Sequence, residues 1–266
     1  MPHTLNDWLA LLERRHHTAI DLGLERCSEV WRLMGRPQPA DRIFVVAGTN
    51  GKGSTVATLC GLLGALGYRY GSYTTPHILR YNERVQVAGE SATDAALVDS
   101  FERVETARGD ISLSYFEFGT LAAFDLLSRQ TLDFAVMEIG LGGRLDAVNL
   151  LDADCAVITP IGLDHQEYLG DDLDSIGREK AGIVRAGRPV VCGENDPPAS
   201  VLRIADELAA PLLRLGADFD ARIVSGQDDG NGQGGGILQF RCGEVRLELP
   251  PPVLEGPHQV GNTATA

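Results

Sequence analysis

Residues 42–54 read RIFVVAGTNGKGS, a short apolar run that leads into a glycine-rich turn. The continuous apolar character of residues 42–47 is typical of a strand buried in a parallel sheet. Beyond the turn, apolar residues recur at helical spacing from Val56 to Leu66. The backbone N–H groups of such a turn, together with the positive end of the following helix, form a site for phosphate oxygens. Residues 42–67 therefore predict a strand, a phosphate-binding loop and a helix.

Two side chains of this loop suit a nucleoside triphosphate. Lys52 can reach the β- and γ-phosphates, and the Ser54 hydroxyl can ligate Mg²⁺. The loop departs from the common GxxxxGK[ST] pattern, because Val46 stands where the first glycine would be and Gly53 separates the lysine from the hydroxyl. An ordinary glycine turn between a strand and a helix is the alternative. Lys52 and Lys180 are the only lysines among 23 Lys and Arg residues, which favours a role at these positions that arginine cannot fill.

The overall composition indicates an acidic protein with enough apolar residues for a sizeable core. Of 266 residues, 37 are Asp or Glu and 23 are Lys or Arg, so the formal net charge is 23 − 37 = −14. This charge argues against nucleic acid or an anionic membrane as a partner, because phosphate groups need a basic surface. Five cysteines without a CxxC pair predict neither a disulfide framework nor a zinc site. Without a signal peptide or a long apolar stretch, we expect a cytoplasmic protein with no membrane contact.

The rest of the chain alternates between strand-like and helix-like patterns, which predicts a mostly parallel sheet flanked by helices. We expect a first helix with Asn6 or Asp7 as its N-cap and a second helix after the turn at residues 21–23. A glycine-rich flexible loop, 226–236, precedes a predicted hairpin over residues 237–249. The remaining strands are expected at residues 69–73, 132–138, 155–159 and 189–192, and the remaining helices at 93–108, 116–129, 175–184 and 200–208.

Polar residues follow three of the predicted strands, at the edge where open α/β sheets bind their ligands. Thr74 and Thr75 follow one strand, Glu138 ends another, and Asp164 and His165 follow a third. A carboxylate at such a position can hold Mg²⁺ directly or through water. Each residue also has a purely structural interpretation, since an acid can cap the next helix and a histidine can be a solvated loop residue. Their expected convergence beside one phosphate loop favours a ligand site.

Several longer motifs resemble one known family, the folylpolyglutamate synthase/dihydrofolate synthase branch of the Mur-ligase-like ATP-dependent amide ligases. These motifs are AGTNGKGS (47–54), TTPH (74–77), ERV (83–85), SYFEFGTLAAF (114–124), MEIGLGGRLDAVN (137–149), ITPIGLDH (158–165), SIGREKAGI (175–183) and GPHQVGN (256–262). The family shares the glycine between the lysine and the serine of the loop. The resemblance implies an α/β phosphate-loop ATPase domain of Mur-ligase type. It also implies a reaction in which ATP phosphorylates a carboxylate that the amine of glutamate then attacks.

The resemblance assigns roles to the loop and to the strand ends. Lys52, Lys180 and His165 would be catalytic. Thr75 and Glu138, with Ser54 close by, would bind a first Mg²⁺, and His165 would bind a second. The residues that would bind ATP are Thr49, Asn50, Gly51, Lys52, Gly53, Ser54 and Asn262. Lys180 resembles a lysine that family members carbamylate, which converts an amine into an anion able to support a metal. A lysine on a helix surface is the alternative for this position.

The resemblance also places the pteroate end of the folate. It would lie against three segments, which are Asp21, Leu22, Gly23 and Leu24, then Ser114, Tyr115, Phe116 and Glu117, and finally Leu145, Asp146 and Ala147. Phe116 either offers a ring on which a flat heteroaromatic group stacks or starts an apolar core stripe. The motifs DLGLER (21–26) and SYFEFGTL (114–121) are more similar to bifunctional bacterial enzymes, which also glutamylate dihydropteroate, than to folylpolyglutamate-only relatives.

The family has a second, smaller α/β domain that supplies the glutamate-binding surface. Residues 1–266 are interpreted as the ATPase domain, with a loop and hairpin appendage at about 219–250. Residues 257–266 have the pattern of a helix that starts and is cut off, so the second domain is expected to be missing. We expect a monomer that uses ATP, dihydropteroate or tetrahydrofolate, and L-glutamate, and a 266-residue chain that is inactive alone. The alternatives are another Mur-type amino-acid ligase, a P-loop kinase or NTPase, and a non-catalytic nucleotide-binding module.

Overall fold

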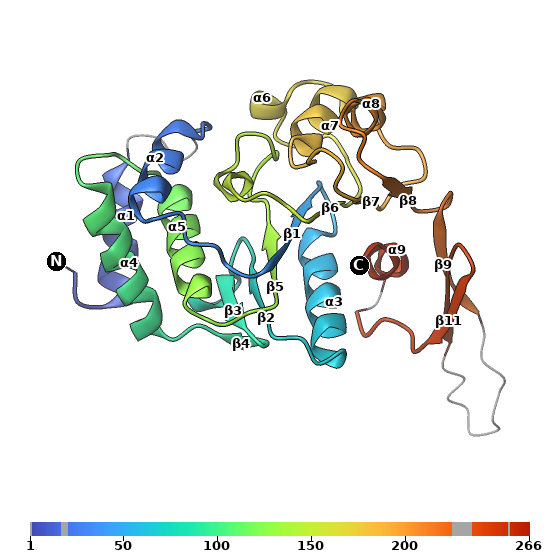
Figure 1. Cartoon of the computed structure of the whole chain (residues 1–266), viewed down its shortest axis with the longest axis horizontal. Helices are drawn as coiled ribbons and strands as arrows, with labels where there is room; N and C mark the ends of the chain where they lie inside the picture. Colours follow the sequence, from blue (N-terminus) through green and yellow to red (C-terminus); the bar gives the residue numbers. More distant parts are fainter. Residues whose placement is uncertain (1, 17–20, 225–235, 255) are drawn as a thin grey trace. The chain divides into compact units, whose positions relative to one another are not determined.

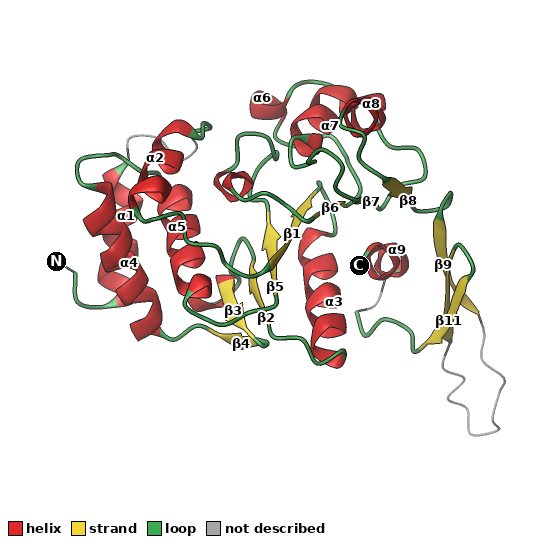
Figure 2. Cartoon of the chain, in the orientation of Figure 1, coloured by secondary structure: helices red, strands yellow, loops and turns green. Residues whose placement is uncertain are grey.

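The computed structural model of the chain describes residues 2–16, 21–224, 236–254 and 256–266. The chain divides into two compact units. The first unit comprises Met1–Val45 and Leu59–Asp154, and the second comprises Val46–Thr58 and Cys155–Ala266. Both units combine strands with helices, as Figures 1 and 2 show, which confirms the predicted α/β class.

The first unit contains a mixed sheet. Its strands are β1 (Arg42–Ala47), β2 (Tyr70–Tyr73), β3 (Val85–Val87), β4 (Glu90–Ser91) and β5 (Phe134–Glu138). They follow the order β4-β3-β2-β5-β1. Strand β2 is parallel to β5, with Ser72 opposite Val136, whereas β3 is antiparallel to both β2 and β4. The carboxyl ends of β2 and β5 therefore meet at the same edge of this sheet.

Helices of the first unit pack against one another (Figure 1), and aromatic side chains fill the space between them. They are α1 (Leu5–Arg15), α2 (Glu25–Leu33), α4 (Asp94–Arg108) and α5 (Tyr115–Ser128), with short 3₁₀ turns η1 (Tyr81–Arg84) and η2 (Ala147–Leu150). The Phe101 ring meets the Trp8 ring edge-on at 5.9 Å and the Phe118 ring at 5.5 Å. These contacts join α1, α4 and α5, and edge-to-face pairs of this kind add stability beyond the area that they bury.

The second unit contains parallel strands and the start of the helix that follows the glycine-rich loop. Its parallel strands are β6 (Cys155–Ile158), β7 (Val190–Cys192) and β8 (Leu212–Arg214), in that order. Its helices are α6 (Gln166–Leu169), α7 (Leu173–Ala181), α8 (Ala199–Glu207) and α9 (Pro257–Thr265), and α7 packs against α8. Helix α3 (Lys52–Ala65) begins at the loop. No helix within the described part of the chain is long and apolar enough to cross a membrane.

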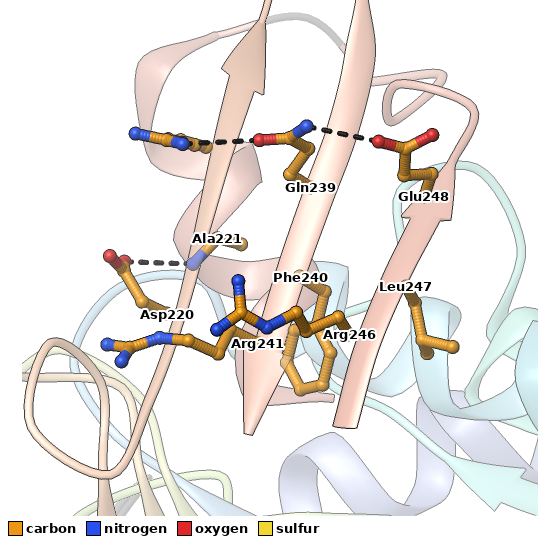
Figure 3. A pocket seen from close by; sticks show the side chains of 9 residues that line it. Asp220, Ala221, Gln239, Phe240, Arg241, Arg246, Leu247 and Glu248 are labelled. Atoms are coloured by element: carbon orange, nitrogen blue, oxygen red, sulfur yellow. Dashed lines mark hydrogen bonds between the residues drawn. The ribbon is translucent and has the colours of Figure 1, made fainter. Parts of the chain in front are cut away.

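A separate antiparallel sheet in the second unit includes the predicted hairpin. It has the order β11-β10-β9, from β9 (Phe219–Val224), β10 (Ile237–Cys242) and β11 (Val245–Leu249), and β9 contacts α9. On its polar face, Gln239 accepts from Arg222 at 3.3 Å and donates to Glu248 at 3.1 Å. These three residues line part of a hollow of about 420 Å³. Figure 3 shows Gln239 and Glu248 facing each other across β10 and β11. Strand β9 was not predicted, and residues 226–235 of the predicted loop lie outside the described residues.

The N-cap prediction for the first helix is wrong. Thr4 is the N-cap, because its Oγ1 accepts from the Asp7 backbone N–H at 3.2 Å. The Asp7 carboxylate in turn accepts from the Thr4 backbone N–H at 3.2 Å. Asp7 therefore occupies the third helical position of a capping box, where an acidic side chain accepts the backbone N–H of the N-cap residue.

Other differences arise where elements are too short to give a periodic pattern. Strands β3 and β4 span three and two residues, so neither has enough residues to alternate between faces. Helix α7 ends at Ala181 rather than at residue 184, because the Val184 N–H bonds back only three residues, to Ala181 O at 3.0 Å. The predicted strand and helix bounds otherwise agree with the structure to within a few residues.

Candidate functional site

The glycine-rich loop of the second unit leaves β1 in a conformation that glycine adopts without strain. Gly48 has φ +145°, and a Cβ at this position would lie 1.8 Å from Thr159 Oγ1. Thr49 and Asn50 both donate their backbone N–H groups to Pro160 O, at 2.9 and 3.2 Å. These contacts hold the start of the loop against the segment that follows β6. The backbone N–H groups of Thr49 and Asn50 therefore shape the loop.

The end of the loop and the first turn of α3 carry the groups that suit an anion. Gly51 has φ +88°, and its carbonyl accepts the Thr55 N–H at 2.9 Å, which closes the first helical turn. Backbone N–H groups ahead of that first bond have no helical partner, and the helix dipole is positive at this end. The backbone of residues 51–54 is thus the part of the loop that suits phosphate oxygens.

Both lysines of the chain meet at one carbonyl oxygen of this loop. Lys52 Nζ donates to Gly48 O at 3.0 Å and to Thr49 O at 3.3 Å. Lys180, on α7, reaches the same Gly48 O at 2.9 Å and is only 3% exposed. A lysine on a helix surface is therefore the wrong interpretation of position 180. The pairing of these amines could not be inferred from their spacing of 128 residues along the chain.

The surroundings of Lys180 make its ammonium group unusually acidic. Burial is the main reason that the pKa of Lys180 falls from 10.5 to about 8, and the nearby charge of Lys52 adds to the fall. Asp164 opposes both effects. A buried amine next to a second cation favours the neutral form, because the protein replaces little of the hydration that the charge loses.

His165 has the backbone strain that often marks functional positions. It has φ +48° and ψ +41°, the left-handed conformation, and is the N-cap of α6. This conformation costs a non-glycine residue about 1–2 kcal/mol. Its backbone N–H donates to Asp164 Oδ1 at 2.9 Å, and the His165 and Asp164 side chains are both about half exposed. The ring is therefore accessible to a ligand, and Asp164 fixes the turn that presents it.

Asn262 packs directly against the phosphate loop. A Cβ on Gly51 would lie 2.3 Å from Asn262 Oδ1, so only glycine leaves room for this side chain. Asn262 Nδ2 donates to Gln259 Oε1 at 3.1 Å, and Asn262 is nearly fully buried. The sequence-based hypothesis that Asn262 contributes to the ATP site is thus compatible with its position in the second unit.

We expect Gly48→Ala to destabilise the chain by about 2–4 kcal/mol, because the new Cβ would overlap the buried Thr159 side chain. Gly53→Ala is the matched control, since a Cβ there meets nothing within 4 Å and the residue lies in α3. Alanine in a helix is more favourable than glycine by up to about 1 kcal/mol. Urea unfolding of both variants measures the difference, and equal midpoints would contradict this geometry.

In the first unit, two of the predicted metal ligands lie together. Glu138 ends β5 and is 4% exposed, and its Oε2 accepts the Thr75 backbone N–H at 3.0 Å. The carboxylate and the Thr75 hydroxyl are hard oxygen donors of the kind that Mg²⁺ prefers. Among the described residues, no three His, Cys, Asp or Glu side chains converge on one point. Mg²⁺ usually keeps several waters and binds through one or two carboxylates, so Glu138 and Thr75 fit part of its coordination shell.

Among the predicted pteroate contacts, some residues shape the local backbone and others are only partly buried. Asp146 is 3% exposed, and its Oδ2 accepts the backbone N–H groups of Gly140 and Leu141 at 3.0 and 2.9 Å. It therefore shapes the turn between residues 140 and 148. The half-buried Phe116 ring lies against Gly140, where a Cβ would be 2.6 Å from the ring. Phe116 is thus neither fully in the core nor fully exposed, and Leu145 and Ala147 flank Asp146.

The two other predicted pteroate segments are linked by an ion-pair network. Arg26 pairs with Asp21 at 2.8 Å and with Glu117 at 3.1 Å. Glu117 also accepts the Ser114 backbone N–H at 2.7 Å, which completes the N-terminal capping box of α5. Gly23, at φ +157°, and the part-buried Leu22 and Leu24 lie between Asp21 and Arg26. The segments 21–24 and 114–117 are therefore brought together within the first unit.

A buried cation, Arg84, was given no role by the sequence reasoning. Arg84 ends η1, and its Nε donates to His77 Nδ1 at 2.9 Å. Its guanidinium carbon lies 5.3 Å from the centre of the Tyr81 ring and 5.7 Å from that of Tyr115. Arg84 lies in the family motif ERV (83–85), but in a chain where almost all basic residues are arginines the local sequence does not show that this one is buried.

A parallel strand, a glycine-rich loop and a helix with lysine at its start define the class of this protein, an α/β domain of the phosphate-loop ATPase type. A profile described as the Mur ligase middle domain matches residues 46–266. The chain therefore belongs to the Mur ligase family.

Two curated relatives have the same name. The chain is 50% identical over 220 residues to the dihydrofolate synthase/folylpolyglutamate synthase of Escherichia coli strain K12. This alignment covers 83% of the present chain and 52% of the Escherichia coli protein. The chain is 35% identical over an alignment of 277 positions to the Mycobacterium tuberculosis protein of the same name. That alignment covers 96% of the present chain and 56% of the Mycobacterium tuberculosis protein. The chain spans about half the length of the curated relatives it matches.

Solved structures support the same assignment. The Escherichia coli FolC structure in complex with DHPP and ADP matches with a TM-score of 0.90 and 44% identity, over 98% of this chain and 61% of that one. The bifunctional folylpolyglutamate synthase/dihydrofolate synthase from Yersinia pestis, complexed with AMPPNP and Mn, matches with a TM-score of 0.87 and 46% identity, over 99% and 61%. These matches confirm the fold and the family resemblance expected from the motifs.

Proposed function

We propose that this chain binds ATP and Mg²⁺ for a ligase that joins L-glutamate to dihydropteroate and to folates. The observation that carries the proposal is the convergence of Lys52 and Lys180 on the carbonyl of Gly48, in a domain of the Mur ligase family. The ligands named for similar structures support the substrates. One is in complex with DHPP and ADP, and another has Mn, AMPPNP and L-glutamate bound.

The proposed reaction has two steps. The substrate carboxylate attacks the γ-phosphorus of ATP, which gives an acyl phosphate and releases ADP. The amine of glutamate then attacks the acyl carbon, which gives an amide and releases phosphate and a proton. Both steps shift negative charge over phosphoryl oxygens, and a fixed cation and oriented N–H groups stabilise such charge. Lys52 and the first turn of α3 would supply them.

Two Mg²⁺ ions would assist by neutralising phosphate charge. In the first unit, Thr75 and Glu138 would supply oxygen ligands for the first ion. In the second unit, Ser54 would supply a hydroxyl, and His165 would supply a ring nitrogen for the second ion. The hard oxygens of Glu138 suit Mg²⁺, and the half-exposed His165 ring is accessible to a ligand.

Lys180 would act as a carbamate. Because its pKa is about 8, a useful fraction of the amine is neutral near physiological pH. The neutral nitrogen attacks CO₂, an N–C bond forms and a proton leaves, so that a buried cation next to Lys52 becomes an anion. This change removes a like-charge repulsion and supplies oxygen ligands for a metal. Arginine cannot make this modification readily, which explains a lysine at position 180.

The pteroate would bind in the first unit. Its ring would stack on Phe116, and the segments 21–24, 114–117 and 145–147 would surround it. The ion pairs of Arg26 and the turn held by Asp146 support this proposal, because they give these segments a fixed shape. We further propose that the enzyme is cytoplasmic and monomeric.

An omission assay on the full-length gene product tests the function. ADP formation is measured with ATP, Mg²⁺, dihydropteroate or tetrahydrofolate, and glutamate, and each is left out in turn. We expect turnover only in the complete mixtures, with both acceptors active. Turnover that ignores the acceptor or the glutamate would contradict the proposal in favour of a kinase or an NTPase.

A further inference from the structure

Arg84 is a deeply buried cation whose neighbours do not neutralise it. It is 8% exposed, and its Nε–H donates to the neutral acceptor His77 Nδ1 at 2.9 Å. Among the residues that the structure describes, no Asp or Glu forms an ion pair with it. The adjacent acid, Glu83, is engaged elsewhere, because its carboxylate accepts the backbone N–H groups of Ile78 and Arg80, each at 2.8 Å. A buried charge of this kind is costly unless a partner arrives.

Aromatic rings hold the guanidinium without cancelling its charge. Tyr81 and Tyr115 lie within cation–π distance, at 5.3 and 5.7 Å. The charge is felt by the surrounding groups. Burial raises the pKa of Tyr73 to about 12 against the opposing effect of Arg84, and burial together with Arg84 lowers the pKa of His77. The neighbours therefore fix the orientation of the guanidinium and leave its positive charge available.

The position of Arg84 links two groups of residues in the first unit. Its carbonyl accepts the Thr74 N–H at 2.8 Å, next to Thr75, whose own N–H is bonded to Glu138. On its other side, Tyr115 belongs to the first turn of α5, among the proposed pteroate contacts. The cation therefore lies between the candidate metal ligands and the candidate pteroate surface.

We propose that Arg84 binds the substrate carboxylate that is to be phosphorylated. The inference rests on the proposed function, in which the pteroate or folate must present that carboxylate beside the metal. Besides its bonds to His77 and to the Tyr73 hydroxyl, the guanidinium of Arg84 keeps terminal N–H groups for the charge-assisted recognition of a carboxylate. Arg84 thus recognises the acid group, whereas Phe116 recognises the ring. His77 is a positioning residue, because it holds the guanidinium through Nε.

A comparison of two ligands tests this role without relying on turnover. Binding of dihydropteroate and of its analogue without the carboxylate is measured by calorimetry on the full chain of the wild type and of Arg84→Gln. We expect the wild type to prefer dihydropteroate by about 10- to 100-fold, the value of a charge-assisted pair. Arg84→Gln should bind both ligands equally, with an affinity for the analogue like that of the wild type.

Two further variants keep the result interpretable. Arg80→Gln, at an exposed arginine of the same loop, should leave the preference unchanged. Arg84→Lys keeps a positive charge but loses the planar guanidinium, so its preference for dihydropteroate over the analogue should be at least about threefold weaker than that of the wild type. If Arg84→Gln does not fold, the result for Arg84→Lys tests the inference. A wild-type preference in either Arg84 variant would overturn the inference. A wild type that binds neither ligand would overturn the proposed function as well.

Discussion

The Lys180→Met variant is expected to lose a rise in stability that the unmodified wild-type chain shows between about pH 8 and 10.5. The pKa of Lys180 is about 8 in the folded chain, below its ordinary value of 10.5, chiefly because the amine is buried. Between these two pH values the unfolded chain binds more protons, so the free energy of unfolding increases with pH. Below pH 8 both states are protonated and this contribution is flat. The total rise is about 3 kcal/mol.

Urea unfolding at pH 7, 9 and 10.5 in CO₂-free buffer measures this effect. The difference between wild type and variant isolates Lys180, because the other titrating groups are common to both. Added bicarbonate should increase the mass of the native wild-type chain by one CO₂, because the neutral amine of Lys180 then forms the carbamate. Equal slopes for wild type and Lys180→Met would contradict the assignment of the pKa shift to this residue.

The same substitution should reduce glutamate-dependent ADP release by the full-length gene product about 10- to 100-fold, the usual cost of removing a group that supports a metal. Lys180→Arg is the matched control, because it keeps the positive charge and the length but cannot form the carbamate readily. We expect it to be as inactive as Lys180→Met. Activity retained by Lys180→Arg would show that the charge, and not the modification, is what position 180 supplies.

The parts of the fold that could be predicted are those in which a long local pattern agrees with the tertiary structure. The apolar run 42–47 and the turn after it predict β1 and the loop because a buried parallel strand has no polar positions to interrupt it. Strand β4 (Glu90–Ser91), in contrast, has no local pattern that predicts a strand, because it is a strand only through its pairing with β3. The capping box of Thr4 was missed because Asn6 and Asp7 are equally good caps by residue type.

The candidate site was predictable residue by residue but not as an arrangement. The scarcity of lysine singled out Lys52 and Lys180, yet only the fold brings both to Gly48 O. Asp146 stays a predicted pteroate contact, and the structure adds that both of its carboxylate oxygens accept backbone N–H groups of its own turn. Arg84 belongs to the family motif ERV (83–85), but its role was missed, because its significance lies in burial without a counter-ion, and burial of one arginine among many cannot be deduced from composition.

Lys52→Ala in the full-length gene product is expected to lower glutamate-dependent ADP release by about 1000-fold, because the phosphoryl charge loses its fixed cation. Folding should be little affected, within about 1 kcal/mol, since Lys52 Nζ bonds only loop carbonyls and is partly exposed. The assay is run beside urea unfolding at pH 7. A variant that keeps turnover would favour a purely nucleotide-binding role for the loop.

Lys52→Ala has a second consequence that does not depend on turnover. Because the charge of Lys52 helps to lower the pKa of Lys180, its removal should raise that pKa and move the stability rise above pH 8. Lys52→Arg is the matched control, since it keeps the charge and should leave the titration of Lys180 in place. If Lys180 titrates in both Lys52 variants as it does in the wild type, the charge of Lys52 does not influence the pKa of Lys180. If only Lys52→Ala shifts, the repulsion between them is what favours a neutral, CO₂-reactive amine at position 180.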